Sequence, residues 1–395
     1  MNDEELLFQK SVREMLSAKL APLCREIDSR HEIPETVLSS MAEFGLLGIT
    51  VPEKYGGPAG NMMMASLAAM EIAAADPSMA TAVYYLLVNG WSHILNRYGA
   101  LKLREELLPR ITSNRAFLGI ATTEPGGGSD LVAMKTSGEI RQGSVVINGE
   151  KTYISGMAEA KRKGGGHLTL VKTDPNAGHR GLTFVYVPAD SKGLEFSVLD
   201  NMGRMGISTS LVHYKDVEVP AHYIIGEPNR GFFYAMEGFN YARTLVSAAC
   251  LGAAQWALEV GEKYIKERRA FGSPLAKYES ISFEYADLAV QIEMTRNEIF
   301  KAAFLLDSKD RGKEVSVKEI NRAVAACKLV APQLAFETIK KVMMWHGALS
   351  YTRDALLEMA MRGVISYLVG AEGALNVMRL IIIRDMLGPE YLPYR

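Results

Sequence analysis

The spacing of apolar residues changes twice along this chain, and those changes limit the folds that it can adopt. Over residues 1–115 apolar side chains recur every three or four positions, as Phe8 and Val12 do, which is typical of amphipathic helices. Between 116 and 228 short runs of β-branched and aromatic residues lie between Gly, Asn, Asp and Pro, which favours strands. From 229 to 395 long segments return to the helical spacing. We therefore predict an α+β protein with an N-terminal helical domain, a middle β domain of the barrel or sandwich type, and a C-terminal four-helix bundle.

Local signals refine this division. Asn148-Gly149 separates two strand-like runs, and because both residue types tolerate positive φ, it predicts a hairpin turn. The run KRKGGG at 161–166 is interpreted as a solvated loop, since no helical pattern follows it as a phosphate-binding loop would require. In the last domain the pattern predicts helices near 229–268, 277–309, 313–345, 353–369 and 371–387.

The composition argues against several classes of protein. With 44 basic and 45 acidic residues the chain lacks the basic excess that is usual in nucleic-acid-binding proteins. No apolar run reaches the roughly 18 residues of a membrane span, and the acidic start lacks the layout of a signal peptide. Cys24, Cys250 and Cys327 are too far apart for a metal pair and too few for a disulfide framework. We expect a cytoplasmic protein that binds no metal and no nucleic acid and does not span a membrane.

One glycine-rich turn is a candidate ligand site. The chain has no HExxH, GxSxG or GxxxxGKS sequence, and its glycines at 126–128 do not open a helix as a nicotinamide-binding GxGxxG would. It does have TTEPGGGSDL, in which Glu-Pro and three glycines leave backbone N–H groups free to approach a planar ring or a phosphate. Thr123 and Ser129 place hydroxyl groups on either side of this turn. An ordinary surface turn is the alternative interpretation.

Eight motifs extend this observation over the chain. They are PEKYGG at 52–57, TEPGGGSD at 123–130, GEKTYIS at 149–155, GLTFVYVP at 181–188, MGRMGISTS at 202–210, DVEVP at 216–220, GEPNRGFFYAM at 226–236 and RRAFG at 268–272. In their residues and their order they resemble the acyl-CoA dehydrogenase flavoproteins over essentially the whole chain. The resemblance implies the family's fold and an enzyme that uses FAD.

The resemblance implies an FAD site built from several of these motifs. Thr123 would face the flavin ring, Ser129 would lie near flavin and substrate, and the strand with Tyr153 and Ser155 would lie against the isoalloxazine. Further cofactor positions are Gly128, Arg268 and Phe271 (the last two at the FAD diphosphate, across a subunit contact), Glu279, Met344, Gly347, Ala348, Ala374 and Asn376. Several of them depart from the family's polar residues: Glu279 replaces a Gln and Ala374 a Thr. The chain is therefore expected to be a divergent member.

The resemblance assigns the catalytic base to Glu372. The family's carboxylate takes the α-proton of the thioester while flavin N5 accepts the β-hydride, and in AEGALNVMR Glu372 lies seven residues before Arg379. This match requires one extra residue after Arg362; without it Ala371 would take the position. The family's second position for a base holds Ala242. Alternatively, Glu372 only favours the N-terminus of the last helix through the helix dipole.

The resemblance also implies substrate contacts and partners. Substrate-binding positions are Ser129, Asn240, Arg243 and Gly373. An electron-transfer flavoprotein would accept the electrons, and the apolar helical surface together with the family's shared FAD site predicts a homotetramer, arranged as a dimer of dimers. Four aromatic residues are interpreted as core in preference to pocket lining: Tyr84, Tyr85, Trp91 and Tyr241.

The sequence is also compatible with other functions. The same fold could serve an acyl-CoA reductase, an oxidase, a monooxygenase or an acyl-carrier-protein dehydrogenase. A non-catalytic, DNA-associated relative is a further alternative, against which the near-neutral charge argues.

Overall fold

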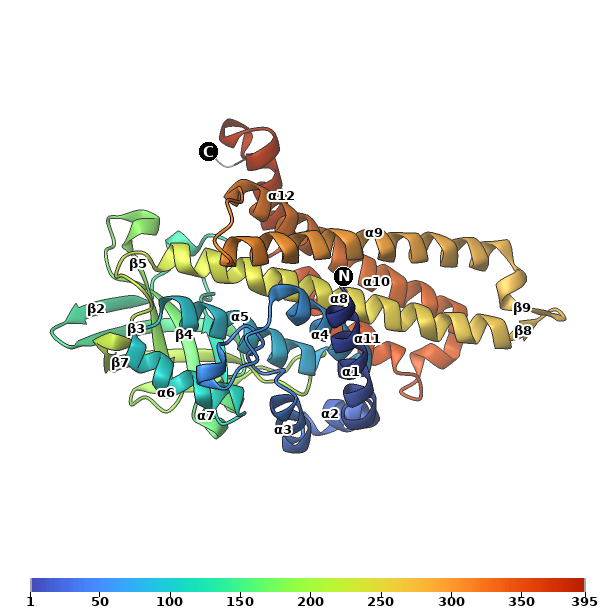
Figure 1. Cartoon of the computed structure of the whole chain (residues 1–395), viewed down its shortest axis with the longest axis horizontal. Coiled ribbons are helices and arrows are strands. Elements are labelled where there is room, and N and C mark those ends of the chain that lie inside the picture. The colour runs from blue at the N-terminus through green and yellow to red at the C-terminus, as the bar shows by residue number, and fades with distance from the viewer. Residues whose placement is uncertain (1, 394–395) are drawn as a thin grey trace.

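The computed structural model describes residues 2–393 and shows helices, then a β sheet, then helices again (Figure 1). The first helices are α1 (Asp3–Lys19), α2 (Cys24–Arg30), α3 (Glu35–Glu43), α4 (Met62–Ala75), α5 (Ala80–Tyr98) and α6 (Leu101–Thr112). The Met- and Ala-rich α4 and the long α5 are buried along most of their lengths. Small side chains on α4 allow close helix packing, so its composition serves the core.

The middle strands form one mixed, half-barrel sheet. They are β1 (Leu118–Ala121), β2 (Ser137–Arg141), β3 (Ser144–Ser155), β4 (Gly166–Lys172), β5 (Leu182–Pro188), β6 (Leu194–Val198) and β7 (Thr209–Pro220). The order along the sheet is β1-β4-β2-β3-β7-β6, with β5 paired to β4. Because β3 and β7 are twelve residues each and pair along most of their lengths, they form the centre of the sheet.

The predicted hairpin at Asn148-Gly149 is wrong, because β3 continues through these two residues. The turn lies earlier, where Arg141 pairs with Ser144 between β2 and β3. At Asn148-Gly149 the pairing with β7 shifts register, and Gly149 has a φ of 141°. Asn148 exchanges hydrogen bonds with Asp216 across this irregularity, at 2.8 and 3.1 Å. The tolerance for positive φ that suggested a turn is used here by a β-bulge.

The prediction of a solvated loop at KRKGGG is also wrong for its first three residues, because they are helical. The middle domain is therefore not all β. Residues Met157–Lys163 form α7, which buries Met157 and Ala160. Lys163 is the last residue of this helix, and its ammonium lies 2.7 Å from Glu35 and 2.8 Å from the Asn114 side-chain oxygen. Tertiary contacts to the N-terminal helices therefore hold a segment whose charges suggested solvent.

The last region has long helices, as predicted. They are α8 (Gly231–Glu267), α9 (Glu279–Asp310), α10 (Val317–His346), α11 (Leu357–Val369) and α12 (Leu375–Met386). A short hairpin of β8 (Arg269–Ala270) and β9 (Ser273–Pro274) joins α8 to α9 at the end of the bundle away from the β sheet (Figure 1). Within residues 2–393, no helix is long and apolar enough to cross a bilayer.

The prediction of helix from 371 is wrong for its first four residues. α12 begins at Leu375, with Ala374 as its N-cap residue in extended conformation. Gly373 has a φ of 92°, which favours glycine and ends any helical path there. Glu372 therefore lies in the loop between α11 and α12.

Candidate active site

The TEPGGGSD turn is held in place by the glutamate within it. Both carboxylate oxygens of Glu124 accept backbone N–H groups, from Lys135 at 2.6 Å and Thr136 at 2.9 Å. The fully buried ammonium of Lys151 donates to the same carboxylate at 2.9 Å. Burial alone would raise the pKa of Glu124, but the hydrogen bonds from Thr136 and Lys135 and the charge of Lys151 lower it to about 2. One buried ion pair thus joins the TEPGGGSD turn, through Glu124, to the GEKTYIS segment, through Lys151.

The outer part of this turn offers unpaired backbone donors. Among residues 2–393, the N–H groups of Gly126, Gly128 and Ser129 find no acceptor in the protein. A Cβ built on Gly126 or Gly127 would meet nothing within 4 Å, so the turn is open on this side. Such a set of free donors on an open surface suits a flavin ring or another planar polar group. The turn therefore fits the FAD that the resemblance implies.

The end of β3 lies beside this turn. The Thr152 N–H donates to the Thr123 oxygen at 2.9 Å, which connects the strand directly to the turn. Tyr153 follows with a φ of 59° and a side chain that is 69% exposed. A left-handed tyrosine is strained, and its exposed ring is available to a ligand at this position. The hydrogen bond from Thr152 to Thr123 thus places the turn next to the end of β3, which carries Tyr153 and Ser155.

Glu372 is buried in its loop, with 8% of its surface exposed. Its backbone oxygen accepts a hydrogen bond from Arg243 Nε at 3.0 Å, whereas no described residue donates to its carboxylate. Burial raises the pKa of Glu372 to about 7, opposed by the charges of Arg243, Lys328 and Arg204. A carboxylate with this pKa can take up a proton near neutral pH. The alternative role at the helix N-terminus is not what the geometry favours, because the side chain is buried beside Arg243.

Arg243 lies on α8 beneath this loop. Its guanidinium stacks over Phe239, with 5.2 Å from its carbon to the ring centroid, and is 6% exposed. Burial lowers the pKa of Arg243 to about 10, opposed by Glu372. Asn240, one turn earlier, donates to the Asn321 side-chain oxygen at 2.8 Å. Arg243 and Gly373 therefore lie together beside Glu372, while Asn240 is engaged with α10.

The remaining cofactor positions lie outside the turn and β3, and two of them are at the far end of the bundle. Arg268 and Phe271 belong to the segment that carries the β8–β9 hairpin, at the far end of the bundle (Figure 1), and Phe271 is fully exposed. Met344, on the last turn of α10, is 75% exposed. The other positions lie at or near helix ends: Glu279 is exposed at the start of α9, Gly347 and Ala348 follow α10, and Ala374 precedes α12. The Asn376 side-chain oxygen accepts a hydrogen bond from Arg379.

Four aromatic residues that might have lined a pocket belong to the core. All are buried, and three donate their hydroxyl groups within the protein: Tyr84 to Asn114, Tyr85 to the Ala65 oxygen and Tyr241 to Asp310. Trp91 packs edge-on against Phe184 and Phe239. His346 is likewise packed, stacked on Tyr264 with ring centroids 3.9 Å apart. The interpretation of the four aromatic residues as core is confirmed.

Several charged residues that the fold brings near the site were not identified among the candidates from the sequence. Lys151, Lys328 and Arg204 were not singled out, although Lys151 and Lys328 have no exposed surface. Lys328 is a lone charge within the apolar run AACKLVAP of α10, a pattern that could have marked it. Arg204 lies in a loop, where no periodicity distinguishes it.

A groove of about 410 Å³ lies elsewhere, between the α2–α3 connection, α7 and the β6–β7 loop. Its walls include Glu32, Arg162, Asp200, Met205 and Ser208, and none of the predicted site residues. It is therefore separate from the Glu372 loop. Within the described residues no cluster of His, Cys, Asp and Glu could hold a metal ion.

Comparisons with known proteins agree with this fold. Three profiles match the chain: the acyl-CoA dehydrogenase N-terminal domain over residues 2–115, the middle domain over 119–217 and the C-terminal domain over 229–387. The chain therefore belongs to the acyl-CoA dehydrogenase family, whose cofactor is FAD and which includes dehydrogenases and reductases.

Individual relatives are similar along their whole length. The probable acyl-CoA dehydrogenase YngJ of Bacillus subtilis is 29% identical, over 98% of this chain and 99% of the relative. The acryloyl-CoA reductase (NADH) of Anaerotignum propionicum is also 29% identical, over 97% of this chain and 94% of the relative. The structure of a glutaryl-coenzyme A dehydrogenase in complex with glutaryl-CoA superposes with a TM-score of 0.90, at 28% identity over 98% and 96% of the two chains.

Proposed function

We propose that this protein is an FAD-dependent acyl-CoA dehydrogenase in which Glu372 removes the α-proton of the thioester. The observation that carries the proposal is the Glu372 carboxylate, which is buried and receives no hydrogen bond from any described residue. A carboxylate of this kind is poised to accept a proton from a bound molecule. Arg243 holds its loop from below through the backbone oxygen.

The chain also offers what an α-proton abstraction needs at the carbonyl. The backbone N–H of Glu372 donates to no acceptor among residues 2–393, so it is free for a thioester oxygen. A donor aimed at that oxygen stabilises the enolate charge that develops as the α-proton leaves. The TEPGGGSD turn and the end of β3 would hold FAD, which would supply the acceptor for the β-hydride. Burial of the loop excludes water from the proton transfer.

The electron acceptor and the direction follow as part of the proposal. An electron-transfer flavoprotein is proposed as acceptor, with acyl-CoA oxidation as the physiological direction. A reductase is the second candidate, supported by the likeness to an acryloyl-CoA reductase that uses NADH. Reduction of an enoyl-CoA by NADH in the presence of the protein would favour this second function.

The experiment begins with the purified protein. We expect it to be yellow and to release FAD, and not FMN, on denaturation. A set of acyl-CoA esters, tested with an artificial electron acceptor, should then include at least one that reduces the flavin. Protein that takes up no FAD when FAD is added, or a flavin that no acyl-CoA reduces, would contradict the proposal.

A further inference from the structure

The charges around Glu372 do not balance: Arg243 and Lys328 are buried, and Arg204 is partly exposed. Three cationic side chains influence its pKa, namely Arg243, Lys328 and Arg204, and Glu372 itself is the single carboxylate that faces them. Asp76 also lies near Tyr367, but its oxygens are occupied by Ser78 and Thr81. Buried charges in proteins are normally paired, because an unpaired charge is costly to remove from water. An excess of positive charge in a ligand site therefore points to a negatively charged ligand.

Two of these cations are already engaged. Arg243 donates through Nε to the Glu372 backbone oxygen and stacks over Phe239. Lys328 donates to the backbone oxygen of Tyr367 at 2.8 Å. The Arg204 guanidinium, by contrast, is partly exposed and donates no hydrogen bond to any described residue. Its charge lowers the pKa values of Tyr367 and Glu372. It is thus the guanidinium that is free to bind a ligand.

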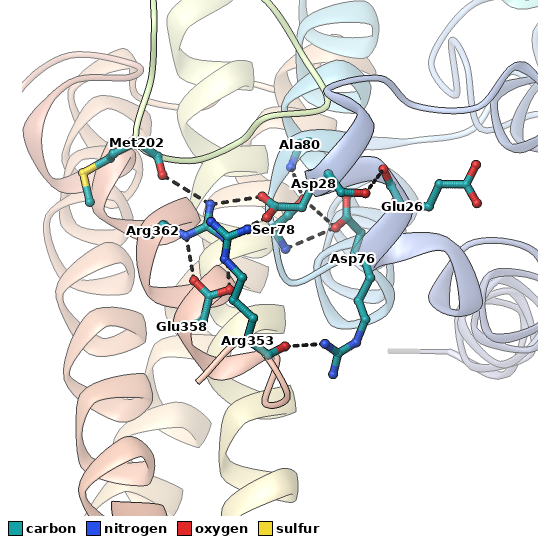
Figure 2. Close-up of polar contacts among 11 residues, drawn as sticks. Glu26, Asp28, Asp76, Ser78, Ala80, Met202, Arg353, Glu358 and Arg362 are labelled. Atoms are coloured by element: carbon teal, nitrogen blue, oxygen red, sulfur yellow. Dashed lines mark hydrogen bonds and ion pairs between the residues drawn. The ribbon is translucent and has the colours of Figure 1, made fainter. Parts of the chain in front are cut away.

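The loop between β6 and β7 holds Arg204 in this position. Met202 accepts a hydrogen bond from Arg362 at 3.3 Å, and Arg362 is itself fixed by ion pairs with Asp28 and Glu358, as Figure 2 shows. Gly203 allows the loop to approach α11, since a Cβ there would lie 2.3 Å from the Arg362 backbone oxygen. Arg204 then adopts a left-handed φ of 57°. Such a strained backbone persists only where its surroundings fix it, so the loop that carries Arg204 is held in place before a ligand binds.

Tyr367 adds a second free donor. Its ring is fully buried on α11, and its hydroxyl group has no hydrogen-bond partner among residues 2–393. An ionised carboxylate can only accept hydrogen bonds. A guanidinium can only donate them, and a tyrosine hydroxyl can donate one. The two free groups therefore complement a carboxylate, and not a hydrocarbon end.

We propose that the acyl group bound here ends in a carboxylate, which Arg204 binds together with the Tyr367 hydroxyl. The proposal rests on the proposed function for the position of the thioester, with the α-carbon at Glu372. The substrate class is then the CoA monothioester of a short dicarboxylic acid. Arg204 is a specificity-determining residue in this proposal, and it takes no part in the proton transfer.

Binding of unreactive analogues tests this without turnover. The probes are S-(3-carboxypropyl)-, S-(4-carboxybutyl)- and S-(5-carboxypentyl)-CoA, each compared with its uncharged terminal amide; these thioethers have no carbonyl beside sulfur and cannot be dehydrogenated. Calorimetric titration of the FAD-loaded protein should give a Kd at least about tenfold lower for one acid than for its amide, because a buried charge pair is strongly favoured over an unpaired guanidinium. Equal Kd values for every acid and its amide would overturn the proposal.

Variants show whether Arg204 is the residue responsible. Arg204→Gln should remove the preference for the acid, and Arg204→Lys should keep part of it, because lysine retains the charge without the planar pair of donors. Arg141→Gln, in the exposed β2–β3 hairpin, is the matched control and should keep the full preference. If Arg204→Gln weakens acid and amide alike, Arg204 acts on the flavin or on Glu372 and the proposal is wrong. If the acids bind selectively while no acyl-CoA reduces the flavin, the proposed function fails and this inference stands.

Discussion

At the scale of single residues, Glu372 shows how burial prepares a side chain for chemistry. A solvent-exposed glutamate is ionised at neutral pH and a weak base. In its loop between α11 and α12, desolvation raises the pKa of Glu372 to about 7, while three neighbouring cations limit the shift. The side chain therefore combines appreciable basicity with a large ionised fraction near pH 7.

The first prediction concerns this residue. In single-turnover flavin reduction by a substrate acyl-CoA, Glu372→Gln should lower the rate by at least about 10²-fold, because it removes the basic oxygen. In the wild type the rate should rise with pH through about 7 and then level off, since the base acts only when ionised. Glu314→Gln, an exposed site, should leave both unchanged. A fall of less than about tenfold would mean that the base lies elsewhere.

The second prediction concerns Glu124 and Lys151, which join the turn to β3. Glu124→Gln leaves the Lys151 charge buried and unpaired, and such a change costs about 3–5 kcal/mol. Lys151→Met should cost less, because Glu124 keeps its two backbone donors. We therefore expect the melting temperature and FAD retention to fall further in Glu124→Gln.

The pKa of Glu124 is lowered to about 2, so its stabilising contribution is present above about pH 4.5 and is lost as the pH falls towards 2. Unchanged melting temperature and FAD retention in both variants would show that the ion pair does not hold the turn.

At the scale of elements, helix ends are stabilised by residues far away in sequence. The Asp307 carboxylate, on α9, accepts the Met62 N–H at 2.6 Å and the Met63 N–H at 3.2 Å at the start of α4. Asn61 caps the same helix locally by accepting from Met64. A helix of the bundle thus completes the N-terminus of a helix in the first region, which no local sequence signal could reveal.

The third prediction follows from this cap. Asp307→Ala should destabilise the protein by about 1 kcal/mol, the usual cost of losing an N-cap acceptor, and lower the melting temperature by about 2 °C. Asp287→Ala, at an exposed position of the same helix, controls for the change in charge. A melting temperature equal to that of the control would mean that Asn61 alone caps α4.

At the scale of the whole molecule, the proposed FAD contacts are divided between two ends. The TEPGGGSD turn belongs to the β region, whereas the β8–β9 hairpin lies at the opposite end of the bundle (Figure 1). Phe271 is fully exposed there, and large apolar side chains such as Phe283, Met294 and Phe304 are exposed on α9. Both observations support a protein whose FAD site is completed by another copy.

The fourth prediction is the oligomeric state. Light scattering at working concentration should give four times the chain mass of 43.4 kDa. The apolar surface of α9 would be buried between copies, as hydrophobic burial favours. A mass equal to that of one chain would contradict the homotetramer.

The fifth prediction connects the assembly to the cofactor. Arg268→Ala should lower the FAD content at least about tenfold at limiting FAD, because a guanidinium suits a diphosphate and its loss weakens binding. The oligomer mass should stay the same, which separates cofactor binding from assembly. Arg230→Gln, an exposed arginine beside Glu227, is the control. Unchanged FAD content in Arg268→Ala would show that the hairpin does not reach the cofactor.

The sequence by itself determined the order of helical, β and helical regions, because hydrophobic period is set by local geometry that each element repeats. It also indicated the glycine-rich turn that we propose binds the flavin and the long helices of the last region, and motif order indicated the family. It could not distinguish the bulge at Asn148-Gly149 from a hairpin, since positive φ serves both. The pairing of Lys151 with Glu124, and the anchoring of the loop before Arg204 to Arg362 on α11, became visible only in the folded protein. Charge pairing in a folded core depends on which segments come into contact, and a local sequence pattern does not contain that information.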